Sequence, residues 1–163
     1  MDINEALKLA DSISTDEGYV IDLFPEPIHH DRFSELEDYF LETFLQEFAD
    51  KISRIVIKMI HYYDAIIYIT EFPEDAPRTE YHTMTYQDLR SLPLQQIVNI
   101  VQFVVTQGRT SVGVFFPETP FVKIEIRGGD EFSVSVYGIQ HNQKKIKILR
   151  ALVEQEGLFL RPF

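Results

Sequence analysis

The chain of 163 residues contains no cysteine. This absence excludes disulfide bonds, thiolate metal sites and a cysteine nucleophile. The sequence also lacks any uncharged apolar stretch of about 18 residues, so we expect no membrane span. Its first residues, Met1 to Glu5, lack the basic segment and the apolar core of a signal peptide. From these absences we predict a cytoplasmic protein that does not associate with membranes.

Motifs typical of common enzyme classes are missing as well. There is no G-x-S-x-G elbow and no H-E-x-x-H pair. The nearest approach to a phosphate loop, residues 127–130, lacks the lysine and the following helix, and we interpret it as a hairpin turn. Adjacent residues rarely face one ion, so we interpret His29, His30 and Asp31 as a polar loop. We therefore predict no metal site and no cofactor.

Basic residues are scarce in the first third of the chain. Residues 1–50 carry 14 acidic and 2 basic side chains, whereas residues 51–163 carry 12 acidic and 13 basic ones. The net charge of −11 therefore originates in the first third. Such a charge disfavours nucleic acids and anionic membranes and favours cationic partners. The plain alternative is that the charge only keeps the protein soluble.

Apolar residues, by contrast, are plentiful. They make up 45% of the chain and include 13 Phe and 8 Tyr, which rules out disorder through lack of core material. The length suits one domain. We predict a single α+β domain over residues 1–163, in which an antiparallel sheet of four to six strands carries two of the helices, 34–62 and 93–107, on one face.

The clearest predicted element is a helix over residues 34–62. Ser34 and Glu37 fit a capping box at its start. Large apolar residues then recur every three or four positions, as on one helical face: Phe33, Leu36, Phe40, Phe44, Phe48, Ile52, Ile55 and Met59. The alternative is a break near Asp50 followed by a strand, because residues 54–57 include β-branched side chains. We prefer one helix because the basic side chains keep helical spacing: Lys51, Arg54, Lys58 and His61.

The remaining elements follow from periodicity and from turn residues. Helices are predicted at 2–14, at 93–107 with a cap at Ser91, and at 142–156, with a single helical turn at 86–92. The 93–107 helix is almost uncharged, so we expect it to be heavily buried. Strands are predicted at 19–24, 65–72, 79–85, 110–116, 122–127 and 131–138, with an edge strand at 158–160.

The pairing of strands 122–127 and 131–138 is predicted from their alternation. A three-residue turn over 128–130 pairs Ile126 with Phe132, Ile124 with Val134 and Val122 with Val136. This register places the apolar side chains on one face and polar ones, such as Lys123 and Glu125, on the other.

One group of residues suggests a surface for a basic protein. Carboxylates lie around Tyr39 on or beside the outward side of the long helix, where charge speeds encounter and the aromatic ring anchors the partner. The predicted partner-binding residues are Asp31, Glu35, Asp38, Tyr39, Glu42 and Asp50. The alternative is an ordinary solvated helix face, with the first helix covering Tyr39.

A second group could line a pocket. Tyr and His beside a carboxylate are capable of acid–base chemistry. The candidates are His61, Tyr63, Asp64, Tyr81 and His82. The alternative is an aromatic rim, because the sequence places no nucleophile near them.

These features support three hypotheses. The first is a non-enzymatic binding or inhibitory protein, immunity- or antitoxin-like in character, that presents its acidic N-terminal third to a basic protein. The second is a small-molecule-binding protein or enzyme with an aromatic pocket between the sheet and the long helix. The third is a structural homo-oligomer, such as a homodimer, in which Ile57 and Tyr39 pack against a second copy. The predicted helix at 142–156 carries basic side chains at Lys144, Lys145, Lys147 and Arg150. We interpret them as a solvated helix face; the alternative is that the acidic first third of the chain neutralises them within the fold.

Overall fold

The computed structural model describes residues 1–29, 31–128 and 133–163. His30 of the histidine cluster and residues 129–132 of the predicted hairpin lie outside these ranges. The helices are α1 (Ile3–Asp11), α2 (Phe33–Tyr62), α3 (Leu94–Gln107) and α4 (Gln143–Gln155), with 3₁₀ turns η1 (Glu80–Met84) and η2 (Ile139–His141). The strands are β1 (Gly18–Asp22), β2 (Ile66–Ile69), β3 (Ser111–Phe116), β4 (Val122–Arg127), β5 (Ser133–Tyr137) and β6 (Phe159–Pro162).

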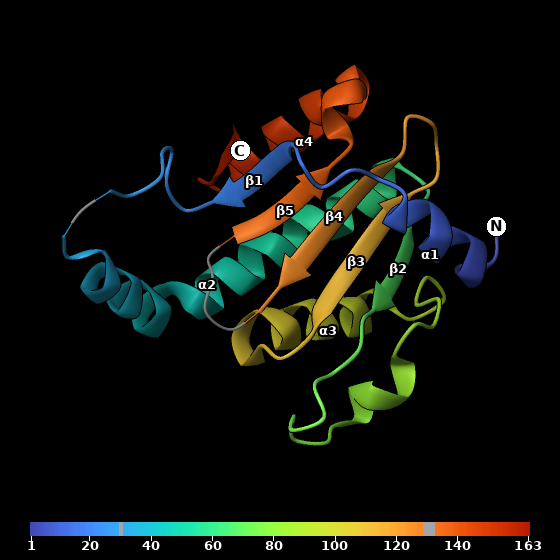
Figure 1. Cartoon of the computed structure of the whole chain (residues 1–163), viewed down its shortest axis with the longest axis horizontal. Helices are drawn as coiled ribbons and strands as arrows, with labels where there is room; N and C mark the ends of the chain where they lie inside the picture. The colour runs from blue at the N-terminus through green and yellow to red at the C-terminus, as the bar shows by residue number, and fades with distance from the viewer. Residues whose placement is uncertain (30, 129–132) are drawn as a thin grey trace.

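The strands form one antiparallel sheet of six strands in the order β2-β3-β4-β5-β1-β6. Helices α2, α3 and α4 cover one face, and α1 lies on the other face near β2 and β3 (Figure 1). The predicted α+β class is thus confirmed, as is the placement of α2 and α3 on one face. Within the described ranges, no helix has the length and apolar character needed to cross a membrane.

Strand alternation decides which side chains enter the core. Val112, Val114 and Phe116 of β3 point toward the three helices and are fully buried there. Their neighbours on the strand point the other way, where Phe115 packs with Ala6 and Ala10 of α1. The small alanines allow α1 to lie close to the sheet, but this helix covers only the β2–β3 end.

The long helix is continuous, so the alternative of a break near Asp50 is wrong. Its start differs from the prediction: the N-cap residue is Arg32, whose side chain makes no capping hydrogen bond, and Ser34 lies inside the first turn. Because the N-cap is Arg32, Ser34 and Glu37 do not form the predicted capping box, and Arg32 forms an ion pair with Glu35. The first turn of the helix therefore contains an Arg32–Glu35 ion pair in place of the expected cap by the Ser34 hydroxyl.

The predicted register of β4 and β5 is shifted by two residues. Ile124 pairs with Val136 and Ile126 with Val134, so the connection is longer than a three-residue turn. A shift of two keeps each side chain on its predicted face, because side chains alternate with a period of two. Lys123 and Glu125 accordingly lie on the face away from α2, as predicted.

The strand predicted at 79–85 is wrong, because this segment forms the 3₁₀ turn η1. The Thr79 amide donates to His82 Nδ1 at 3.0 Å, and the Thr83 hydroxyl donates to the Glu80 carbonyl at 2.9 Å. Such local bonds between residues three apart favour a tight turn over an extended strand. Only Thr85 bridges to the sheet, at Ile69. Residues 86–92 likewise form turns rather than the predicted helical turn.

Candidate functional site

The first four turns of α2, residues 33–46, extend past the strands (Figure 1). We call this segment the α2 tip. None of its residues is buried, and the first buried residue of the helix is Phe48. A helix of 30 residues is about 45 Å long, whereas a strand of five residues covers about 17 Å. The strands are therefore too short to cover the whole length of the helix.

Large apolar side chains on the α2 tip are consequently open to solvent. Phe33, Leu36 and Tyr39 are 42%, 38% and 56% exposed. Periodicity placed Phe33 and Leu36 on the core-facing side, and that interpretation is corrected by the overhang of the helix. Helix α1 packs on the far face of the sheet, so the alternative that it covers Tyr39 is also wrong.

The apolar side of the α2 tip is held in place by aromatic contacts. Phe40 meets Phe24 edge-on, with ring centroids 5.0 Å apart, and Phe44 at 5.3 Å. Tyr39 contacts both Phe40 and Phe44, at 5.7 and 6.2 Å. Edge-to-face pairs of this kind restrict ring motion. Tyr39 is thus positioned by its neighbours while more than half of it stays exposed.

Four of the predicted carboxylates come together around this tip. Glu35, Asp38 and Glu42 share one helical face at spacings of three and four residues and are exposed, as is Asp31 just before the helix. Arg32 donates to Glu35 at 2.7 Å, and this hydrogen bond lowers the pKa of the Glu35 carboxyl. The tip is therefore acidic at neutral pH.

Asp50 does not join this group. It is half-buried on α2, where it accepts hydrogen bonds from the side-chain amides of Gln46 at 3.1 Å and Gln102 at 2.7 Å. The hydrogen bond from Gln102 connects α2 with α3.

Basic residues of α4 do not neutralise the α2 tip through any ion pair among the described residues. Lys145 binds Glu118 at 2.6 Å, and Arg150 donates to the Leu160 carbonyl at 3.2 Å. Elsewhere in the first third of the chain, Arg161 pairs with Asp22 and Lys51 with Glu47. Asp31, Asp38 and Glu42 are therefore open to water.

The predicted pocket residues are divided among three places. His61 and Asp64 line a groove of about 630 Å³ at the end of α2. Tyr63 packs edge-on against Phe116, with Lys145 Nζ 4.7 Å from its ring. Tyr81 lies against Phe103, and His82 stacks on Phe72 at 3.9 Å. The five residues therefore do not form one site.

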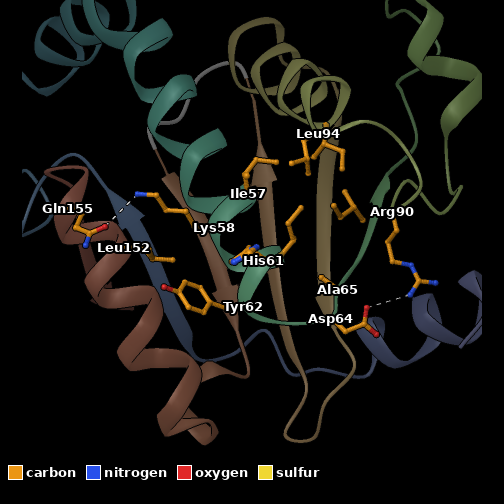
Figure 2. A pocket seen from close by; sticks show the side chains of 13 residues that line it. Ile57, Lys58, His61, Tyr62, Asp64, Ala65, Arg90, Leu94, Leu152 and Gln155 are labelled. Carbon is orange, nitrogen blue, oxygen red and sulfur yellow. Dashed lines mark hydrogen bonds and ion pairs between the residues drawn. The ribbon is translucent and has the colours of Figure 1, made fainter.

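The groove at the end of α2 is mostly apolar with charged edges. Figure 2 shows Lys58 and Gln155 on one side and Asp64 and Arg90 on the other. Arg90 also binds Asp88 at 2.7 Å. Within the described ranges, His61 has no hydrogen bond that orients its ring, and no three acidic or histidine side chains are arranged to hold a metal ion. This geometry does not assemble acid–base machinery.

Comparison with known proteins adds no further guide: no family profile matches the chain, and no match was found among curated proteins or solved structures.

Proposed function

We propose that this protein is a non-enzymatic, cytoplasmic binding protein that engages a basic protein partner through the α2 tip. In character it is immunity- or antitoxin-like, because occupying a cationic surface inhibits a partner that uses that surface. The single observation that carries the proposal is the overhang of the α2 tip, which carries exposed carboxylates beside half-exposed aromatic side chains.

The two chemical components of the tip have different tasks. Carboxylates attract a basic partner over a distance of about 8 Å at physiological salt and raise the association rate. Tyr39, Phe33 and Leu36 supply apolar area that a partner removes from water. Aromatic side chains at the centre of an interface contribute most of its stability, so Tyr39 is the expected anchor.

A second copy of the chain is a poorer occupant of this surface. Two tips packed together would place Asp38 and Glu42 near the same residues of the other copy, and like charges oppose such contact. A basic partner gains from the same carboxylates. The charge of the tip therefore favours a heterologous complex over a homodimer.

The test is affinity capture from the native cell lysate with three versions of the full chain. Wild type is compared with Asp38→Lys/Glu42→Lys and with the control Glu71→Lys/Glu74→Lys, which changes net charge equally on an exposed loop after β2. We expect one basic protein to be retained by wild type and by the control at low salt. The tip variant should retain at least tenfold less of it.

Further readouts separate this interface from nonspecific charge attraction. High salt should release the partner from wild type, and Tyr39→Ala should weaken capture without changing thermal unfolding, because Tyr39 is 56% exposed. Equal loss of capture in the tip variant and the loop control would contradict the proposal. Capture of the partner at the wild-type level by both the tip variant and Tyr39→Ala would also contradict the proposal.

A further inference from the structure

The face of the sheet opposite α2 contains a second pocket, distinct from the α2 tip. Its volume is about 410 Å³, and it lies between α1 and strands β2, β3 and β4. Sequence analysis placed Lys123 and Glu125 on a polar strand face but did not recognise a pocket there. Polar residues of the three strands and of α1 line this one space.

A glycine shapes the floor of this pocket. Gly113 in β3 lies in register between Tyr68 of β2 and Glu125 of β4. A Cβ atom at this position would overlap the Tyr68 ring, so the ring rests directly over the glycine backbone. Because Gly113 has no side chain, the pocket extends down to the strand backbone at this position. The Tyr68 ring that packs there is only 4% exposed.

Lys123 is a buried cation at one side of the pocket. It is 9% exposed, and its ammonium lies 3.9 Å from Glu125 and 5.4 Å from the Tyr137 ring centroid. A separation of 3.9 Å is an ion pair but is too long for a hydrogen bond. Among the described residues no hydrogen-bond acceptor meets Lys123 Nζ, and an ammonium group has three donors. This leaves donors available to a ligand in the pocket.

Acidic and phenolic groups surround the rest of the space. Glu125 of β4 and Asp11 of α1 both line the pocket. Glu125 Oε1 accepts hydrogen bonds from Arg127 at 2.9 and 3.0 Å, so Oε2, on the side of Lys123, is the oxygen open to a ligand. Burial, together with the charges of Asp11 and Glu125, raises the pKa of the Tyr68 phenol. Tyr68 therefore stays protonated at neutral pH and is able to donate a hydrogen bond.

Tyr86 lies at the mouth of the pocket in a strained conformation. Its φ of 54° is unfavourable for a bulky side chain. A hydrogen bond of 2.8 Å from its amide to the Ile69 carbonyl holds this backbone against the edge of β2. Such strain in a residue that lines a pocket is typical of ligand sites.

The charge arrangement selects the ligand class. A simple anion would meet two carboxylates, and a simple cation would meet the buried ammonium of Lys123. An α-amino acid carries its carboxylate and its ammonium on the same carbon, and their opposed charges match the neighbouring Lys123 and Glu125. A zwitterion is thus the species that both charges of the pocket attract.

We infer that this pocket binds a free α-amino acid, with the ligand carboxylate at Lys123 and Tyr68, the ligand ammonium at Glu125 and Asp11, and the ligand side chain beside Tyr86. This inference goes beyond the proposed function, because it concerns the opposite face of the sheet. A protein that binds its partner through the α2 tip gains a separate small-molecule site.

The test is isothermal titration calorimetry of the full chain with each of the twenty common amino acids. We expect at least one to bind with a stoichiometry of one, and its N-acetyl and C-amide derivatives to bind at least tenfold more weakly. Asp11→Asn, which alters an exposed side chain, and Glu125→Gln should each weaken binding at least threefold. Lys123→Met keeps most of the apolar stem and should abolish binding.

Variants elsewhere make the result independent of the proposed function. Asp38→Lys/Glu42→Lys should bind the amino acid like wild type, and thermal unfolding of each variant establishes that it is folded. Absence of binding by all twenty amino acids at millimolar concentration would overturn the inference. Equal binding of the blocked derivatives, or wild-type affinity in both Asp11→Asn and Lys123→Met, would also overturn it.

Discussion

Two glycines of this protein, Gly113 and Gly157, are each required by the space or the backbone conformation at their position. Gly113 has an ordinary extended backbone, but its missing Cβ leaves room for the Tyr68 ring. Gly157 has the opposite constraint, because its φ is 70° while a Cβ atom at this position would have no neighbour within 4 Å. The two glycines are therefore required for separate physical reasons.

Gly113→Ala should lower the free energy of unfolding by about 2–3 kcal/mol, because a buried ring has to move. Gly157→Ala should cost about 1 kcal/mol, since only the backbone is strained. Urea denaturation at neutral pH measures both. Adding Tyr68→Ala to Gly113→Ala should cost less than the sum of the single changes. If Gly113→Ala is as stable as Gly157→Ala or more stable, the Tyr68 ring is not tightly packed against Gly113.

At the scale of elements, α2 is clamped to the end of α4 by charged groups. Glu156 accepts hydrogen bonds from Arg54 at 2.7 and 3.0 Å, and Lys58 lies at 3.7 Å. The Glu156 side chain is only 10% exposed. Hydrogen bonding from Arg54 lowers the pKa of Glu156 below its ordinary value of 4.5. The ionised form is therefore the one that stabilises the folded state.

Glu156→Gln should reduce the free energy of unfolding at pH 7 by about 1 kcal/mol. A lowered pKa in the folded state contributes stability above the unfolded value of 4.5 and loses it as pH falls through the folded value. The difference between wild type and the variant should thus shrink progressively below pH 4.5. Urea denaturation across that range measures it, with Glu154→Gln on the exposed side of α4 as control. A difference that grows with acidity would contradict this linkage.

Most elements could be predicted from periodicity, and the failures have local causes. Strong apolar repeats identified α2, α3 and α4, and alternation identified β3, β4 and β5. The register of β4 and β5 was wrong by two residues, because alternation distinguishes faces but not shifts of even length. The η1 segment has side chains that bond their own backbone, which propensity alone does not reveal.

At the scale of the whole molecule, the central feature is the mismatch between a long helix and short strands. The periodicity of α2 predicted one continuous apolar face, yet its fully buried residues begin only at Phe48. Phe40, Leu41, Phe44 and Leu45 are partly buried against the edge of the core, and Phe33 and Leu36 are exposed. Sequence reasoning could locate the acidic residues of the tip but not the exposure of Phe33 and Leu36, because the width of the sheet depends on strand lengths and order. The pocket under α1 was missed for a related reason: β2, β3 and β4 had to be placed side by side first.

The same mismatch separates the charges of the molecule. Lys145 of α4 pairs with Glu118 and Arg150 donates to the Leu160 carbonyl of β6, whereas the carboxylates of Asp38 and Glu42 remain in water. Part of the negative charge of the first third of the chain therefore lies on the α2 tip, which projects past the strands (Figure 1).

Hydrogen–deuterium exchange of the protein, free and in complex with its captured partner, shows whether the partner binds at the α2 tip. In the free protein, amides of residues 33–46 should exchange faster than those of 48–62, because all buried residues of α2 lie in the latter segment. On binding, protection should rise most in residues 33–46. Protection confined to the groove at the end of α2 or to the α1 side of the sheet, with an unchanged tip, would contradict the assignment of the α2 tip as the binding surface.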